Sequence, residues 1–156
     1  MELNKKVEKA LNDQIGLEFE ASIKYASIAS FFTNEELPQL AKFFFRQSTE
    51  ERDHAEKLIK YVLDRDGQVR IPAIPAAPFE FASPFDAVKL ALEGEEKVTQ
   101  SIYKIYELAQ AEKDHATAVM LQWFITEQVE EESTVRQMLK FVERGKESGM
   151  LTLEEY

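Results

Sequence analysis

Two sets of polar side chains that could bind metal ions recur in this chain on one spacing. Each set begins with a lone glutamate, which is followed 33 residues later by a second ligand-type residue and three residues after that by a third. Adding 77 to each position of the first set gives the second set: 18 to 95, 51 to 128 and 54 to 131. The residues are Glu18, Glu51 and His54 in the first set, and Glu95, Gln128 and Glu131 in the second.

The chemistry that these residues favour is the binding of two divalent metal ions. Residues three apart lie on one face of a helix, so the later members of each set point the same way. Ionised carboxylates in an apolar core are costly unless they are paired or bound to metal. No lysine or arginine lies beside the four glutamates on the same stripes except Arg65, far along its helix. Two divalent ions would balance the four charges, and mostly oxygen ligands with one imidazole suit iron or manganese better than copper or zinc.

Each motif taken alone has an ordinary explanation. Glu-x-x-His on a helix is often a surface pair, lone glutamates are usually solvated, and the three glutamates at 130–132 would form a charged helix face. Tyr25 and Trp123 flank the site by helical spacing, and both could be core aromatic residues. The joint occurrence of six ligand-type residues, in two copies and in phase with apolar stripes, favours the metal site.

Four long amphipathic helices are predicted to carry these residues. Apolar residues recur at steps of three and four over residues 4–33, 36–66, 84–111 and 115–145. Residues 68–82 contain three prolines, which a helix does not tolerate, so they form one extended connection.

Capping signals mark the predicted helix boundaries. The polar stretch 33–36 breaks the first helix and offers an N-cap for the second. Gly67 is a natural C-terminal cap. Ser83 followed by Pro84 and Asp86 is a strong start signal for the third helix.

The lengths of the connections predict the topology. Short turns make helices one and two antiparallel, and likewise three and four, while the long connection lets helices two and three run parallel. The fold class is therefore all-α: a four-helix bundle with one long crossover between helices 2 and 3. We expect the bundle to span residues 1–145 and a short C-terminal tail to span 146–156. The internal offset indicates that the two hairpins are pseudo-repeats.

Composition limits the possible partners and location. A chain of 156 residues is most simply one domain. The net charge of −10 argues against nucleic acid or an anionic membrane as a partner. There are no cysteines, which excludes disulfides, iron–sulfur clusters and cysteine-bound zinc. No secretory signal and no apolar run long enough to span a membrane is visible, so we expect a cytoplasmic protein.

These motifs resemble the ferritin family, and specifically its prokaryotic non-haem branch. The resemblance runs from Leu17-Glu18 through Leu121-Gln122-Trp123 to the segment Glu127-Gln128-Val129-Glu130-Glu131-Glu132. It implies iron storage and detoxification in a 24-subunit shell, with a ferroxidase centre that oxidises Fe(II) by dioxygen or peroxide. By the resemblance, Glu18, Glu51 and His54 hold one iron, and Glu95, Gln128 and Glu131 hold the second, with Glu51 bridging.

The resemblance also implies roles around this di-iron centre. Tyr25 matches a tyrosine that donates an electron or a hydrogen bond. We hypothesise that Gln128, a neutral and weak ligand, keeps the second site loose enough to release Fe(III). A third iron site is implied by three further carboxylates: Glu50, Glu127 and Glu130.

Three departures from relatives carry further expectations. Bacterioferritins have a second Glu-x-x-His and bind haem through a methionine at the place of Arg52, so no haem is expected. Ala118 and Leu121 stand where animal ferritins have channel acids, so iron is expected to take another route. Family members usually continue into a fifth helix, whereas only Met150 to Tyr156 follow here, too few for a stable independent helix. Open four-fold pores are the expected result.

Two competing functions remain open from the sequence. One is another di-iron enzyme on the same bundle, such as a rubrerythrin-like peroxidase or an oxygenase; the absence of rubredoxin-type cysteines weighs against the former. The other is a bundle that binds metal only for stability or assembly.

Overall fold

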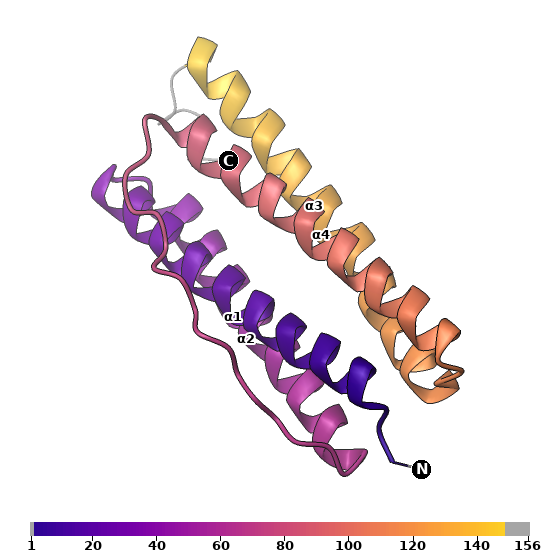
Figure 1. Ribbon diagram of the computed structural model, residues 1–156. Coiled ribbons are helices and arrows are strands. Elements are labelled where there is room, and N and C mark those ends of the chain that lie inside the picture. Colours follow the sequence, from indigo (N-terminus) through magenta and orange to yellow (C-terminus); the bar gives the residue numbers. More distant parts are fainter. Residues whose placement is uncertain (1, 149–156) are drawn as a thin grey trace.

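Four long helices make up the part of the chain that the structure describes. The computed structural model describes the backbone of residues 2–148 and the side chains of residues 2–145. The helices are α1 (Lys5–Asn34), α2 (Pro38–Asp64), α3 (Pro84–Ala111) and α4 (His115–Ser148), and no strand occurs among the described residues (Figure 1). The predicted all-α bundle is confirmed.

The crossover runs along the length of the bundle and makes α2 and α3 parallel, as predicted (Figure 1). It is fastened to α1 by Asn12, whose Nδ2 donates to the carbonyl of Gln68 at 2.9 Å and whose Oδ1 accepts from the backbone N–H of Arg70 at 2.8 Å. Pro72 then packs onto α1 at Gly16, where a Cβ would lie 2.4 Å from the proline Cγ. The crossover is therefore held by specific contacts although it has no regular structure.

The first three helices end in the same way, with a left-handed residue that is not glycine. These residues are Glu36, Asp66 and Lys113, with φ of 59°, 57° and 57°. The predicted cap at Gly67 is therefore wrong by one position, because Asp66 takes the left-handed conformation. Gly67 follows it and donates its N–H to the carbonyl of Val62 at 2.8 Å, which completes a Schellman-type end.

The predicted helix boundaries differ from the observed ones by two or three residues at three places, and the first helix is shifted by one residue at each end. The second helix begins at Pro38 rather than 36, with Leu37 as a cap that makes no side-chain hydrogen bond, so the polar stretch 33–36 does not cap it. A proline is well suited to the first helical position, which explains the later start. The same helix ends at Asp64 rather than 66. The last helix extends to Ser148, and the remainder of the predicted tail, 149–156, lies outside the described residues.

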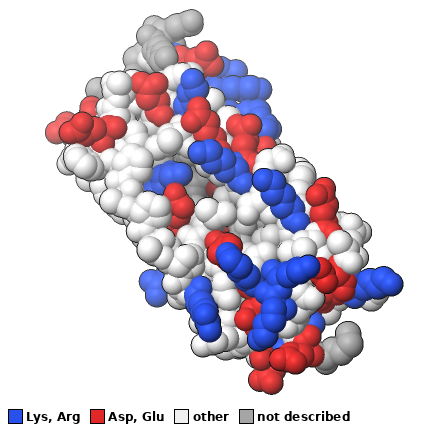
Figure 2. All heavy atoms as spheres, viewed as in Figure 1, with Lys and Arg blue, Asp and Glu red and all other residues white. Residues whose placement is uncertain are grey.

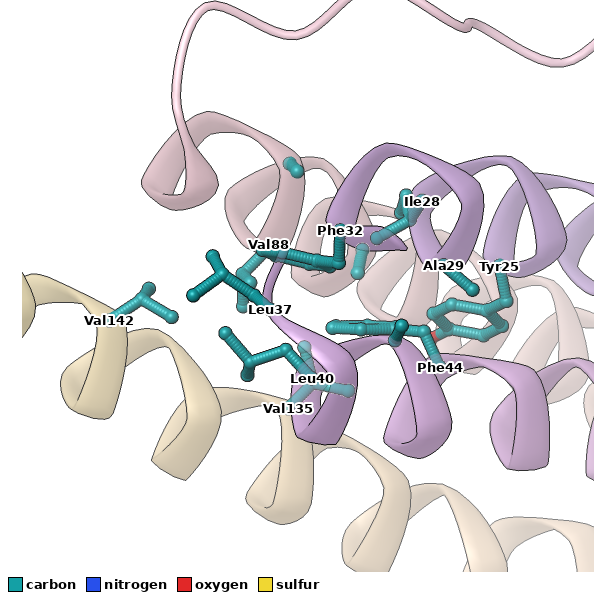
Figure 3. Packing of buried hydrophobic residues seen from close by; sticks show 13 residues of the cluster. Tyr25, Ile28, Ala29, Phe32, Leu37, Leu40, Phe44, Val88, Val135 and Val142 are labelled. Carbon is teal, nitrogen blue, oxygen red and sulfur yellow. The ribbon is translucent and has the colours of Figure 1, made fainter. Parts of the chain in front are cut away.

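The hydrophobic core is divided into two clusters. One lies toward the C-terminal half of α1 and includes Phe32 and Phe44, which stack at 5.5 Å; Tyr25 closes its inner end against Phe44 (Figure 3). The other lies toward the N-terminal half of α1 and includes Leu11 and Phe124. The helix level between the two clusters carries the polar residues of the predicted site.

The helices are not packed equally against one another. α1 packs against α2 and α3, and α3 packs against α4. Within the described residues, no Cα of α2 comes within 8 Å of a Cα of α4, so these two helices meet through long side chains such as His54 and Trp123. None of the described helices is both long and apolar enough to cross a membrane.

Candidate metal centre

The structure brings the six predicted ligand residues together in the polar level between the two core clusters. Each of the four helices contributes at least one of these six residues. Where a helix contributes two, they are three residues apart and so lie on the same helix face. All six side chains are buried, with exposed fractions of 6% or less: Glu18, Glu51, His54, Glu95, Gln128 and Glu131.

Two groups of three ligand atoms share one residue. Atoms of Glu18, Glu51 and His54 lie within 4.8 Å of one another, and so do atoms of Glu51, Glu95 and Glu131. The Nδ1 of His54 is 3.4 Å from Oε2 of Glu51 and 3.9 Å from Oε2 of Glu18. Glu51 belongs to both groups, and its role as a bridge between two metal ions stays a prediction.

Several buried polar atoms of the centre have no hydrogen-bond partner. They are Oε2 of Glu18, both carboxylate oxygens of Glu51, Nδ1 of His54 and Oε2 of Glu131. A buried polar atom without a partner is costly, more so when charged. Within the described residues, none of the four glutamates forms an ion pair with a lysine or arginine. The atoms thus fit divalent cations, which would satisfy all of them at once.

Burial controls the protonation of these carboxyl groups. Desolvation raises the pKa of Glu51 well above its usual range, and the negative charges of Glu95 and Glu18 raise it further. The pKa of Glu18 is also raised, chiefly by burial. Burial, with the charges of Glu95 and Glu50, raises the pKa of Glu131 to about 8. Without metal the centre therefore holds protons near neutral pH, and a metal ion must displace them.

Gln128 contacts the centre through its amide nitrogen. Its Nε2 donates to Oε2 of Glu95 at 3.1 Å, to the backbone carbonyl of Glu95 at 3.2 Å and to Oγ1 of Thr99 at 3.0 Å. In this orientation Gln128 positions Glu95, and its role as a metal ligand stays a prediction.

Two supporting residues around the centre were not predicted. Gln14, one turn before Glu18, donates from Nε2 to Oε1 of Glu18 at 3.2 Å, and its own Oε1 accepts from Ser101 at 2.5 Å. Thr99, one turn after Glu95, supports Gln128 as described above. The spacing of four residues from a ligand was the available signal, but polar residues at that spacing are common on helices.

The two predicted flanking aromatic residues lie on different sides of the centre. Tyr25 donates its hydroxyl to Oε1 of Glu95 at 2.5 Å, and burial together with the charge of Glu95 raises its pKa well above the usual value. Trp123 lies edge-on to His54 with ring centroids 5.4 Å apart, and the amine of Lys57 lies 3.6 Å from its ring centroid. Trp123 thus covers His54 on the solvent side.

A cavity of about 590 Å³ opens between α2 and α4, whose Cα atoms nowhere come within 8 Å of each other in the described residues. Ligand atoms of His54, Glu127 and Glu131 lie within 4.8 Å of one another at this cavity. Glu50 and Glu130 line the same cavity, as does one basic residue, Arg46. The structure thus gathers the three carboxylates of the predicted third site beside the centre, while their role as ligands stays a prediction.

Comparison with known proteins decides the family. A family model described as a ferritin-like domain matches residues 8–144. The chain belongs to the ferritin family. Ferritin BfrB of Mycolicibacterium smegmatis is 41% identical over 154 residues, covering 99% of this chain and 84% of that protein. The bacterial non-heme ferritin of Staphylococcus aureus is 36% identical, covering 98% and 93%.

Solved ferritin structures agree with this assignment. The open-pore ferritin from Archaeoglobus fulgidus superposes with a TM-score of 0.95 at 34% identity, covering 98% of this chain and 94% of that one. The predicted assignment to the prokaryotic non-haem ferritins is confirmed.

Residues named as departures have clear positions in this ferritin. Arg52, at the place of a haem-binding methionine, is exposed and pairs with Glu56 at 3.2 Å. Leu121, one of the two positions compared with channel acids, is fully buried in the core. Ala118 is half-buried.

Proposed function

We propose that this ferritin oxidises Fe(II) with dioxygen at the centre between its four helices and stores the product as a ferric mineral. Iron storage is the function that membership of the ferritin family supports. The observation that carries the oxidation is Glu51, which belongs to both groups of ligand atoms and has no other partner. Two ions joined in this way can give up electrons as a pair.

The proposed reaction balances with two Fe(II) ions as substrates. Each ion loses one electron, and dioxygen takes up both electrons with two protons to become hydrogen peroxide. The four buried glutamates cancel the charge of two Fe(II) ions, so oxidation leaves excess positive charge that favours release of protons. Iron both reaches and leaves the centre through the acidic cavity beside Glu127, where Glu50 and Glu130 would hold a third ion on the way.

We further propose a shell of 24 subunits with open four-fold pores. Its support is the similarity to the archaeal ferritin whose structure is described as open-pore. Mass measurement by light scattering tests this: the expected value is 24 times the 18.0 kDa of one chain. A monomer or dimer under storage conditions would overturn the shell.

The oxidation is tested by anaerobic loading with Fe(II), followed by air, with near-ultraviolet absorbance measured against iron added per chain. A fast phase that saturates near two irons per chain, followed by slower uptake without precipitation, is expected. A fast phase followed by precipitation outside the protein would leave an oxidase without storage. A rubrerythrin-like peroxidase on the same bundle is not favoured, because the matched relatives and structures are ferritins.

A further inference from the structure

A second, narrower opening reaches the centre from the opposite side of the bundle. A crevice of about 80 Å³ lies between α1 and α3, and its lining includes the buried residues Tyr25 and Glu95. Figure 2 shows a hollow between α1 and α3 in this view, with basic side chains at its margin. At its outer end lie Lys97, which is exposed, and Lys24, which is half-buried.

The missing side chain of Gly94 helps to form this crevice. A Cβ at Gly94 would meet only the side chain of Lys24, at 3.4 Å from Nζ and 4.0 Å from Cδ. No backbone and no core side chain closes this place, so a longer side chain at position 94 would extend into the crevice. Ala21 lines the same crevice from α1.

Volume selects what the crevice can admit. The crevice, at about 80 Å³, has about one seventh of the volume of the cavity of about 590 Å³ between α2 and α4. Small molecules suit this narrower crevice better than a divalent cation that keeps its hydration shell of about six waters.

Charge selects in the same direction. The charged residues that line the crevice are two lysines and two glutamates: Lys24, Lys97, Glu20 and Glu95. The crevice therefore has no excess of negative charge that would draw cations in. The cavity between α2 and α4 is several times larger and acidic, which suits cations instead.

We propose that the crevice between α1 and α3 admits dioxygen, a small uncharged molecule, while iron reaches the centre through the acidic cavity between α2 and α4. This inference rests on the proposed oxidation of Fe(II). The crevice reaches Glu95, which shares a group of ligand atoms with Glu51 and Glu131. Dioxygen and iron would thus approach the same centre from opposite faces and would not compete for one path.

The test fills the crevice and measures the dependence of Fe(II) oxidation on dissolved dioxygen. Gly94→Leu fills it from α3, and Ala21→Leu fills it from α1. In each variant the dioxygen concentration at half-maximal rate is expected to rise about fivefold or more, with the rate at saturating dioxygen kept. Gln100→Leu adds the same side chain on an exposed position of α3 and is the matched control.

A second readout separates this inference from the proposed function. Anaerobic titration with Co(II), followed by its visible spectrum, measures metal binding without oxidation and is expected to be unchanged in both variants. If the parent protein does not oxidise Fe(II), the proposed function fails. If the parent oxidises Fe(II), and a folded variant with normal Co(II) binding keeps the parent's dioxygen dependence, only the crevice proposal fails.

Xenon gives a test that needs no variant. Crystals of the parent protein under xenon pressure are expected to show xenon between Gly94 and Tyr25, because xenon binds in small cavities with apolar walls and Ala21, Ala91 and Val98 line this crevice. Crystals without xenon in this crevice would overturn the proposal even if the filling variants failed to fold.

Discussion

Glu51 and Gln128 occupy equivalent positions in the two halves of the molecule, yet they do opposite things. Both carboxylate oxygens of Glu51 lack a hydrogen-bond partner, whereas the amide of Gln128 donates to Oε2 of Glu95 at 3.1 Å. The first half therefore supplies a buried carboxyl group without hydrogen-bond partners, and the second half supplies an amide that holds Glu95 in place. The internal repeat has become functionally asymmetric at this pair.

Replacing Gln128 with histidine tests the hypothesis that Gln128 is a weak ligand that lets the second site release Fe(III). An imidazole binds iron more strongly than an amide oxygen, so Gln128→His is expected to retain oxidised iron and to slow later rounds of turnover about tenfold. Sequential additions of Fe(II), with absorbance recorded for each round, measure this effect. Gln122→His, on an exposed position of the same helix, should leave all rounds unchanged. Equal turnover in Gln128→His and the parent would refute the hypothesis.

Replacing Glu51 with glutamine is expected to separate stability from activity. The substitution removes a buried acid whose pKa is raised well above its usual range and which therefore destabilises the fold as pH rises, so the metal-free protein should gain about 1–3 kcal/mol of unfolding free energy at pH 8. The fast phase of Fe(II) oxidation should fall by about 100-fold or more, since supporting residues alone account for 10–100-fold effects at metal sites. Urea unfolding and rapid-mixing absorbance measure the two effects. Glu56→Gln, exposed on the same helix, is the control and should change neither.

The stability of the metal-free protein should depend on pH in a direction set by Glu131. Its pKa is raised from 4.5 to about 8, so between these values the folded chain holds more protons than the unfolded chain. The free energy of unfolding must then fall as pH rises from about 5 to about 8. Thermal unfolding with a chelator present, recorded at several pH values, should show a melting temperature that decreases over this range. A melting temperature that rises instead would show that the buried carboxyl groups are ionised without metal.

Added metal should reverse this trend. Cations compete with protons for the same carboxylates, so stabilisation by Zn(II) is expected to grow as pH rises from 6 to 8. The measurement is the difference in melting temperature with and without Zn(II) at each pH. A difference that stays constant with pH would mean that Zn(II) binds elsewhere.

Close packing of the crossover should make Gly16 intolerant of any side chain. The Cβ of Gly16→Ala would lie 2.4 Å from Pro72, so the crossover must move, at a cost of about 1–3 kcal/mol. Gly94→Ala is the matched control, because its Cβ meets only the end of Lys24 at 3.4 Å and alanine is the better helix former. Thermal unfolding should therefore show a lower melting temperature for Gly16→Ala and an equal or higher one for Gly94→Ala.

The sequence allowed the bundle and the gathering of the six residues to be predicted because both follow from helical periodicity. Positions 18, 51, 54, 95, 128 and 131 all fall on buried helix faces, as the apolar stripes around them indicated. The cap at Asp66 was missed because glycine next to it is the usual left-handed residue, and sequence preference alone does not place the turn to one residue. The orientation of Gln128 was also beyond prediction, since an amide can present either oxygen or nitrogen.

The two openings could not be found from the sequence at all. The acidic cavity depends on the separation of α2 from α4, and the crevice depends on the space that Gly94 leaves opposite Lys24. Both are distances between helices, which periodicity within a helix does not report.

The division of the core into two clusters affects where the molecule unfolds locally. Each half of the bundle is stabilised by its own apolar cluster. The polar middle is stabilised instead by hydrogen bonds among Tyr25, Glu95 and Gln128, and by metal ions when they are bound. The middle of the bundle is therefore expected to be less stable than the two apolar clusters on either side of it. Removal of metal is therefore expected to lower the protection of amide protons at this middle level more than within the apolar clusters on either side of it.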